Sequence, residues 1–386
     1  MRHSTGRRCP RRCRDASGQL GLVSPVDPWG VQPYGATTMP GAASITELIR
    51  AASLAGGGGT ASWDEVVAPV RSFLGQVTEV LNGQVREFEA EIAEYARYAL
   101  DSQGKRLRPA LVALAGGMFG PLTGHHVSLA AIVEMIHLAT LVHDDIMDGA
   151  AMRRGRPSLA ARWGSDVAVL VGDCLFAHAL KLAAMLDSVE VCRSVAMSTH
   201  VVCAGEILQG HRRRRWNLTR PEYFKVLEMK TGELFALACE LGGRLASASA
   251  GERQALRRYG LSLGTAYQVY DDVLDLYGEE DAAGKSLGTD LAKGRVTLPL
   301  LVFLERASEV ERGRMLGWLE NWDAAHFGEA RAMLDRHDAL VESRHAIDLL
   351  LNTAREALSE FPDVPETRAL VTLPGFLARQ TAALGS

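Results

Sequence analysis

Two short runs of aspartates are the residues with the clearest chemical potential in this sequence. Residues 144–148 read DDIMD and residues 271–275 read DDVLD, and both runs lie in apolar, helix-like stretches. Positions i and i+4 share a face of a helix, so Asp144 and Asp148 point the same way, as do Asp271 and Asp275. All-oxygen ligands favour a hard cation such as Mg2+. One run alone would fit a solvated helix face, but two runs predict a metal-binding wall on each of two helices.

Cationic residues accompany both aspartate runs. Residues 104–109 read GKRLRP, and residues 153–155 read RRG shortly after the first run. Lys230 interrupts an apolar helix, and Lys285 and Lys293 follow the second run. Each group alone would be ordinary surface charge. Together they fit a diphosphate, because carboxylates bind one only through bridging metal, and Lys and Arg neutralise the remaining oxygens. The expected chemistry is metal assistance to a departing diphosphate.

The elements that must position these residues are helices. The chain has 386 residues, of which 47% are apolar and 23% charged, as in a globular protein, and its net charge of −4 gives no reason to expect nucleic acid as a partner. Apolar residues recur at helical spacing, and no segment alternates with period two between hairpin turns. We therefore expect an all-α fold. The longest helical segments are predicted at 84–102, 107–119, 126–148, 166–187, 190–209, 221–246, 252–278 and 296–307.

The N-terminal segment has a different character. Five of the fourteen prolines fall in the first 40 residues, among several arginines and without periodicity. We interpret residues 1–61 as disordered or of low complexity, and residues 62–386 as the helical domain, opened by a capping box at Ser62 and Glu65. A translation start at Met39 would explain the unusual tail. An organelle-type presequence is a weaker explanation.

Membrane and redox signals point to the cytoplasm. The best candidates for a membrane span, 129–142 and 167–186, are interrupted by charged residues and histidines, so we expect no span. The six cysteines form no CxxC pair, which fits small buried side chains in a reducing compartment.

Seven motifs in a fixed order make the sequence similar to the trans-isoprenyl diphosphate synthase (polyprenyl synthetase) family over roughly residues 62–384. The motifs are GKRLRP, EMIHLATLVHDDIMD, RRGRP, GDCLFAHA, KTG, YQVYDDVLD and GKSLGTDLAKGRVTLPL. The resemblance implies a single large helical bundle of the isoprenoid synthase type with a central active-site cavity. It implies a Mg2+-dependent prenyltransferase, with three Mg2+ per site and a homodimer as the usual assembly. The implied substrates are isopentenyl diphosphate and an allylic diphosphate, farnesyl or geranylgeranyl.

The same resemblance implies roles for individual residues. The Mg2+ ligands would be Asp144, Asp148, Asp271 and Asp275, with Asp145 and Asp272 as supporting carboxylates. Allylic diphosphate would contact Arg153, Lys230 and Lys285. Isopentenyl diphosphate would contact Lys105, Arg108, His137 and Arg154. Thr231 and Gln268 would line the site and stabilise the developing allylic cation. His137 lies seven residues before Asp144, two turns along the same helix face, which favours this role over that of an ordinary core histidine.

Product length is expected to depend on the helix that carries the first aspartate run. In the family the growing tail passes the turn before this run, here Ala139 and Thr140, and then Ile136. Short-chain relatives place an aromatic residue there, whereas this chain has small ones. The expected product is therefore a C30–C45 polyprenyl diphosphate. Geranylgeranyl diphosphate is the main alternative, because Ile136 or a residue on another helix would also form a floor.

Other functions remain as alternatives. A class I terpene cyclase shares the first aspartate motif but normally has a different second metal motif. A non-catalytic subunit of a heteromeric synthase typically loses aspartates, and none is missing here. The run Arg212 to Arg215 is less expected in the family, and we interpret it as a solvated loop, with acidic lipid headgroups as a second reading.

Overall fold

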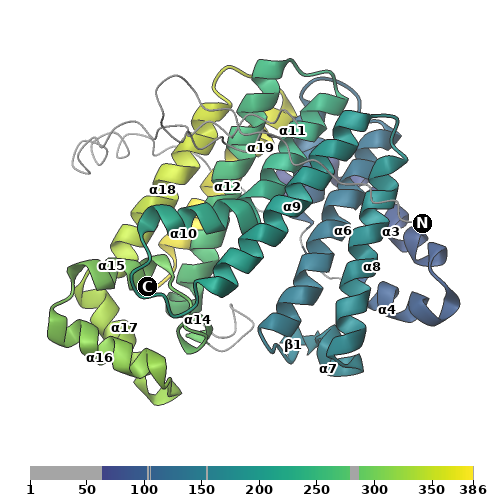
Figure 1. The fold of residues 1–386 in the computed structure, drawn as a ribbon. Coiled ribbons are helices and arrows are strands. Elements are labelled where there is room, and N and C mark those ends of the chain that lie inside the picture. Colours follow the sequence, from purple (N-terminus) through teal and green to yellow (C-terminus); the bar gives the residue numbers. More distant parts are fainter. Residues whose placement is uncertain (1–62, 102–103, 105, 154, 279–286, 386) are drawn as a thin grey trace, which may run out of the picture. The chain divides into compact units, whose positions relative to one another are not determined.

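Helices make up nearly all of the regular structure in the computed structural model, which describes residues 63–101, 104, 106–153, 155–278 and 287–385 (Figure 1). This confirms the predicted all-α class. The predicted disordered segment 1–61 and the capping residue Ser62 lie outside the described residues. The first described helix begins directly after that position, at Trp63.

The described part of the chain contains α-helices, short 3-10 and π turns, and one pair of strands. In chain order they are α2 (Trp63–Val66), η1 (Ala68–Val70), α3 (Arg71–Gln84), η2 (Val85–Glu87), α4 (Ala90–Leu100), α5 (Leu107–Gly117), α6 (Gly124–Met147), β1 (Met152–Arg153), β2 (Arg156–Pro157), α7 (Leu159–Trp163), α8 (Ser165–Ala184), α9 (Val189–His211), α10 (Arg220–Leu227), η3 (Glu228–Gly232), α11 (Glu233–Leu245), α12 (Ala250–Tyr277), α14 (Thr289–Ala292), α15 (Leu298–Arg306), α16 (Glu309–Glu320), η4 (Ala324–His326), α17 (Phe327–Arg336), α18 (Ala339–Ala357) and α19 (Pro365–Ala382).

Local sequence signals explain where several helices begin. Thr219 and Glu222 form a reciprocal capping box at α10, and Ser249 and Glu252 form one at α12. A third box opens α16. The helices α6, α9 and α12 lie within a few residues of their predicted bounds, because long apolar periodicity is the most reliable of the helix signals.

Three expectations about local structure need correction. The segment predicted at 84–102 is broken, since α3 ends at Gln84 and α4 begins only at Ala90. The segment predicted at 221–246 is interrupted by the π turn η3. Met152–Arg153 and Arg156–Pro157 form a two-residue antiparallel hairpin, which is too short to show alternation in the sequence.

The helix α6 lies in the core and brings the first aspartate run with it. It packs against α3, α5, α8 and α11, and most of its length is apolar on every face. The helix α11, which contacts α6, also packs against α5 and α12. These helices approach closely through glycines: a Cβ on Gly242 would lie 2.4 Å from the Val112 carbonyl oxygen, and one on Gly260 would lie 2.4 Å from that of Phe235. Both aspartate runs therefore sit near the C-terminal ends of closely packed helices.

The expectation that no stretch is long and apolar enough to span a membrane is wrong. In the described residues, α6, α8 and α9 are each long and apolar enough to cross a membrane, because the few charged residues within them do not lower the mean hydropathy sufficiently. Their surroundings differ: the apolar window of α6 is 78% buried in the fold, against 39% for α8 and 28% for α9.

Candidate active site

A cavity of about 1060 Å³ lies between the C-terminal halves of α6 and α12. Asp144 and Asp148 reach it from α6, and Asp271 and Asp272 reach it from α12. Further lining residues come from the segment before α5, from α9, α10, α11 and α19, from the η3 turn and from residues 289–297. The cavity thus brings together two aspartate runs that lie far apart in the sequence.

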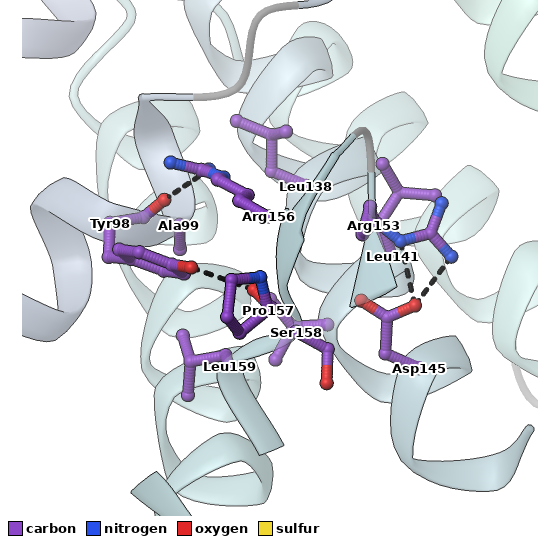
Figure 2. Close-up of a pocket in the computed structure, with 11 residues that line it drawn as sticks. Tyr98, Ala99, Leu138, Leu141, Asp145, Arg153, Arg156, Pro157, Ser158 and Leu159 are labelled. Carbon is purple, nitrogen blue, oxygen red and sulfur yellow. Dashed lines mark hydrogen bonds and ion pairs between the residues drawn. The ribbon is translucent and has the colours of Figure 1, made fainter. Parts of the chain in front are cut away.

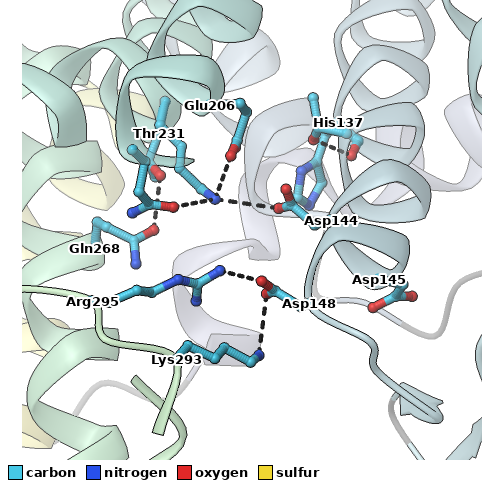
Figure 3. A network of polar contacts seen from close by, with 12 residues as sticks. His137, Asp144, Asp145, Asp148, Glu206, Thr231, Gln268, Lys293 and Arg295 are labelled. Atoms are coloured by element: carbon cyan, nitrogen blue, oxygen red, sulfur yellow. Dashed lines mark hydrogen bonds and ion pairs between the residues drawn. The ribbon is translucent and has the colours of Figure 1, made fainter. Parts of the chain in front are cut away.

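The first aspartate wall is paired with cations in this structure (Figure 3). The Asp148 carboxylate lies 3.1 Å from Nη2 of Arg213 and 3.4 Å from Nζ of Lys293, and it also pairs with Arg295. Burial alone would raise the pKa of Asp148, but the charges of Arg295 and Lys293 outweigh it and lower that pKa. Asp148 is therefore held as a carboxylate.

Asp145, the second aspartate of the first run, does not line this cavity and instead lines a smaller pocket beside the β1–β2 hairpin (Figure 2). It is 5% exposed, and one of its oxygens accepts hydrogen bonds from Nε and Nη2 of Arg153 at 2.7 and 2.6 Å. Burial raises the pKa of Asp145, and Arg153 partly offsets that rise. The pair ties the β1–β2 hairpin to α6, and the supporting role of Asp145 stays a prediction.

The hairpin has a second anchor on α4. Nη2 of Arg156 donates to the Tyr98 carbonyl at 2.7 Å, and its guanidinium lies 4.2 Å from the centre of the Tyr98 ring. The Tyr98 hydroxyl donates in turn to the Pro157 carbonyl at 2.7 Å. These contacts hold β2, which pairs with the strand β1 that carries Arg153. Arg153 also lines the large cavity.

Two carboxylates of the second aspartate run, Asp271 and Asp272, line the cavity and differ in their hydrogen bonding. Asp271 lines the cavity and forms no hydrogen bond or ion pair within the described part of the chain. Asp272 is buried and accepts hydrogen bonds from the Tyr223 hydroxyl at 2.7 Å and from Nε2 of Gln268 at 3.0 Å. Burial, followed by the charge of Asp290, raises the pKa of Asp272.

Two hydrogen bonds orient the side chain of Gln268. Its carbonyl oxygen accepts a hydrogen bond from Thr231 at 2.8 Å, while its amide nitrogen donates to Asp272. Both polar ends of the side chain are therefore fixed, and both Gln268 and Thr231 line the cavity, as predicted.

Asp275 is the predicted ligand that the structure does not bring to the cavity. It is 0% exposed, and its two oxygens accept hydrogen bonds from the Thr289 hydroxyl at 2.6 Å and the Asp290 backbone N–H at 2.9 Å. The segment that begins α14 covers the end of α12, so Asp275 supports that segment. Helical spacing placed it on the face of Asp271, but tertiary packing decides what each carboxylate meets.

Lys230 projects from η3 into the cavity between two carboxylates. Its Nζ lies 2.7 Å from Oε2 of Glu206 and 3.5 Å from Oδ2 of Asp144, and it donates to Gln209 at 3.0 Å. A π turn is often found at functional sites, and here it directs Lys230 and Thr231 into the cavity. Burial raises the pKa of Glu206. Glu206 and Gln209 were not predicted as site residues, although their i, i+3 spacing on α9 is a usable signal in the sequence.

The residues expected to meet isopentenyl diphosphate are only partly described. Arg108 and His137 line the cavity, and the Arg108 guanidinium lies 4.8 Å from the centre of the Phe235 ring. The other two predicted contacts, Lys105 and Arg154, lie outside the described residues, as does Lys285, which was predicted to meet the allylic diphosphate.

The three predicted chain-length residues occupy different places. Thr140 lines the cavity, whereas Ala139 and Ile136 are 0% exposed and do not line it. The cavity face of α6 is formed by Glu134, His137, Thr140 and Leu141. A tail that follows the present cavity would therefore pass Thr140 and leave Ala139 behind it.

The carboxylates fit a divalent metal that is shared with its ligand. Within the described residues, no three His, Cys, Asp or Glu side chains cluster closely enough to hold a metal by themselves. Mg2+ commonly keeps several waters and uses only one or two protein carboxylates together with substrate phosphates. Asp144, Asp148 and Asp271 supply that donor type from two walls of one cavity.

The interpretation of residues 212–215 as a solvated loop is wrong for two of the four arginines. Arg214 and Arg215 are exposed, but Arg212 and Arg213 are partly buried and line the cavity. Arg213 is a cavity residue that the sequence did not identify, because a run of like charges usually marks a solvated segment.

Comparisons with known proteins point to one protein family. The family model described as polyprenyl synthetase matches residues 89–334. The chain is 31% identical over 310 residues to an all-trans-nonaprenyl-diphosphate synthase (geranyl-diphosphate specific) of Rhodobacter capsulatus, covering 80% of this chain and 95% of that one. It is 32% identical over 318 residues to a short chain isoprenyl diphosphate synthase of Methanothermobacter thermautotrophicus, covering 80% and 98%. A solved polyprenyl synthase of Caulobacter crescentus, complexed with calcium and isoprenyl diphosphate, matches with a TM-score of 0.79 and 34% identity over 83% of this chain and 99% of that chain.

Proposed function

Because the chain belongs to the polyprenyl synthetase family and is an enzyme that makes polyprenyl diphosphates, we propose that it joins isopentenyl diphosphate to farnesyl or geranylgeranyl diphosphate and extends the product to C30–C45. The observation that carries this proposal is the meeting of Asp144, Asp148 and Asp271 across one cavity that also holds Lys230 and Arg295. Carboxylates on two walls and cations between them form a site for a metal-bound diphosphate.

The proposed Mg2+ ligands are Asp144, Asp148 and Asp271. When bound there, Mg2+ would neutralise the diphosphate and assist its departure as a Lewis acid. Lys230, Lys293 and Arg295 would bind the diphosphate oxygens that the metal does not reach, because they already lie against the two first-wall carboxylates. The number of three Mg2+ ions per site stays a prediction. Because Asp275 is fully buried, we do not propose this residue as a Mg2+ ligand.

The neutral residues of the cavity would serve the allylic carbon skeleton. Thr231 and Gln268 present fixed dipoles, and such preorganised dipoles stabilise a developing cation without reorganising during the reaction. Phe235, Leu263 and Tyr267 line the same region and would exclude water from a reactive carbocation.

We assign the second diphosphate, that of isopentenyl diphosphate, to Arg108 and His137, with Lys105 and Arg154 as further expected contacts. Arg108 and His137 line the cavity on the side of α5 and α6. Lys285 stays an expected contact of the allylic diphosphate. The proton lost in the final elimination would pass to the released diphosphate.

A C30–C45 product is favoured by the small residue Thr140 at the cavity wall and by the similarity to a nonaprenyl diphosphate synthase. Geranylgeranyl diphosphate is the second candidate. It is favoured by the complete burial of Ala139 and Ile136, which do not line the cavity, and by the similarity to a short chain synthase.

We also propose a homodimer in the cytoplasm. The helix α8 presents apolar side chains to the surface of the described chain, among them Val169 at 41% exposure and Leu170 at 67%, and Met185, directly after the helix, is 69% exposed. An exposed apolar helix face of this kind is typical of a protein interface, and a second copy would cover it.

The test is an incubation of purified protein with labelled isopentenyl diphosphate, farnesyl diphosphate and Mg2+, with the dephosphorylated products resolved by length. A metal-dependent ladder that ends at C30 or beyond supports the proposal. A ladder that stops at C20 supports geranylgeranyl diphosphate. No elongation from any primer, in the absence of EDTA, would contradict the proposed reaction.

A further inference from the structure

The arginine run between α9 and α10 is attached to the rest of the site by its backbone. The Arg214 N–H donates to the Gly294 carbonyl at 2.8 Å. Both residues have positive φ, 59° and 65°, and a Cβ on Gly294 would lie 2.6 Å from Cγ of Arg214. Gly294 therefore permits a close approach of the two loops. Its neighbours, Lys293 and Arg295, are the cations that pair with Asp148.

A second attachment holds the run to α10. Nη1 of Arg212 donates to the Glu222 carbonyl at 2.8 Å, and Arg215 lies 3.7 Å from the Glu222 carboxylate. The loop is thus fixed on two sides, and Arg213 between them points to the cavity, where its Nη2 lies 3.1 Å from Asp148.

The Asp148 carboxylate has more cationic partners than its single charge can balance. Three cations, Arg213, Lys293 and Arg295, share this carboxylate, and Asp290 pairs with Arg295 at 3.0 Å. In the described part of the chain, two carboxylates thus pair with three cations. Nε of Arg213 is also buried without a hydrogen-bond partner among the described residues. The Arg213 guanidinium therefore shares its one counter-ion with two other cations, and its Nε–H donor is not used by the ion pair.

We propose that Arg213 is an additional diphosphate-binding residue of this chain, which exchanges its ion pair with Asp148 for oxygens of the allylic diphosphate. The inference rests on the proposed function, since it needs Asp148 to bind a divalent cation. Once Asp148 binds that cation, the Arg213 guanidinium loses its counter-ion beside the incoming anion. Its planar fork matches two diphosphate oxygens.

The choice of the allylic diphosphate follows from position. Arg213 contacts Asp148 at the C-terminal end of α6, whereas His137 lies 11 residues earlier on α6 and Arg108 lies at the start of α5. A purely structural Arg213 would instead keep its bond to Asp148. Its loss would then affect folding of the loop and leave anion affinity unchanged.

The experiment is calorimetric titration of the full chain with inorganic pyrophosphate in Mg2+. Arg213→Gln should weaken binding by about 10- to 100-fold, the range for one charge-assisted hydrogen bond. Arg213→Lys should fall between wild type and the glutamine variant, because it keeps the charge and loses the fork. Arg215→Gln removes the same charge from an exposed neighbour that pairs only with Glu222 in the described residues, and it should bind as wild type does.

A kinetic measurement separates binding from structure. Arg213→Gln should raise KM for farnesyl diphosphate and leave KM for isopentenyl diphosphate within about twofold. Equal pyrophosphate affinity in wild type and Arg213→Gln overturns the inference, as does an equal loss in Arg215→Gln. If wild type itself fails to bind pyrophosphate with Mg2+, the proposed function fails instead. The lysine variant keeps the test valid should Arg213→Gln not fold.

Discussion

Replacing Asp148 with asparagine should change pyrophosphate binding in opposite directions with and without Mg2+. Without metal, the Asp148 carboxylate is the counter-ion of three cations, Arg213, Lys293 and Arg295. It therefore competes with pyrophosphate for these cations. The amide releases these cations, and metal-free binding should become tighter. With Mg2+, the same change removes a proposed metal ligand, and binding should become weaker.

The magnitude follows from the distances. At 3.1 and 3.4 Å, two of these charge pairs are each worth about 5 kcal/mol at an effective dielectric of ~20. Desolvation and screening cancel most of this, and the net value of a hydrogen bond to a charged group is about 1.5–3 kcal/mol. We therefore expect metal-free binding to tighten by about tenfold, and kcat to fall by about 10²- to 10³-fold, as on loss of one preorganised electrostatic contact.

The assay is titration calorimetry with inorganic pyrophosphate in EDTA and in Mg2+. Asp271→Asn is the matched control, because Asp271 lines the same cavity without an ion pair in the described part of the chain. It should weaken binding in Mg2+ and leave binding in EDTA unchanged. Weaker binding of Asp148→Asn in both conditions would refute the reasoning, and so would tighter binding in both.

Further predictions concern other parts of the site and the surface. Lys230→Met should lower kcat by about 10²-fold or more in steady-state assays, because a cation between Asp144 and Glu206 is lost; an unchanged kcat would exclude Lys230 from the reaction. Tyr223→Phe should lower the free energy of unfolding by about 1–3 kcal/mol in urea titrations, since buried Asp272 loses a donor; unchanged stability would contradict that account of Asp272. Thr140→Phe should shorten the product by at least one isoprene unit on chromatography, whereas Ala139→Phe, fully buried, should chiefly destabilise the fold by about 1–3 kcal/mol; shortening by Ala139→Phe alone would move the tunnel to the other face of α6. Leu170→Glu should yield monomers in sedimentation velocity, and Val310→Glu, on the exposed face of α16, should not; an unchanged assembly in both variants would remove α8 from the interface.

The sequence predicted best what depends on long periodic patterns. The helices α6 and α12 and their terminal aspartate runs were found because apolar periodicity extends over many turns. Thr231 and Gln268 were expected at the site from the resemblance, and both line the cavity. The hairpin at 152–157 was missed, since two residues per strand leave no readable period.

The errors arise where tertiary contacts decide a side chain's surroundings. Asp271 and Asp275 share a helix face by spacing, yet the start of α14 covers only Asp275. Arg213 belongs to a run that looks solvated, yet the bond from Arg214 to Gly294 turns it toward Asp148. Glu206 was missed because its partner Lys230 lies on another element, and no local pattern links them.

The central claim is that carboxylates from both walls hold a diphosphate through divalent metal. The most direct measurement is the amount of Mn2+ bound by the wild-type chain, followed by electron paramagnetic resonance, with and without inorganic pyrophosphate. The structure predicts tight Mn2+ binding only when pyrophosphate is present, because no three metal-ligating side chains converge in the described part of the chain. Equal Mn2+ binding with and without pyrophosphate, or none in either case, would contradict the claim.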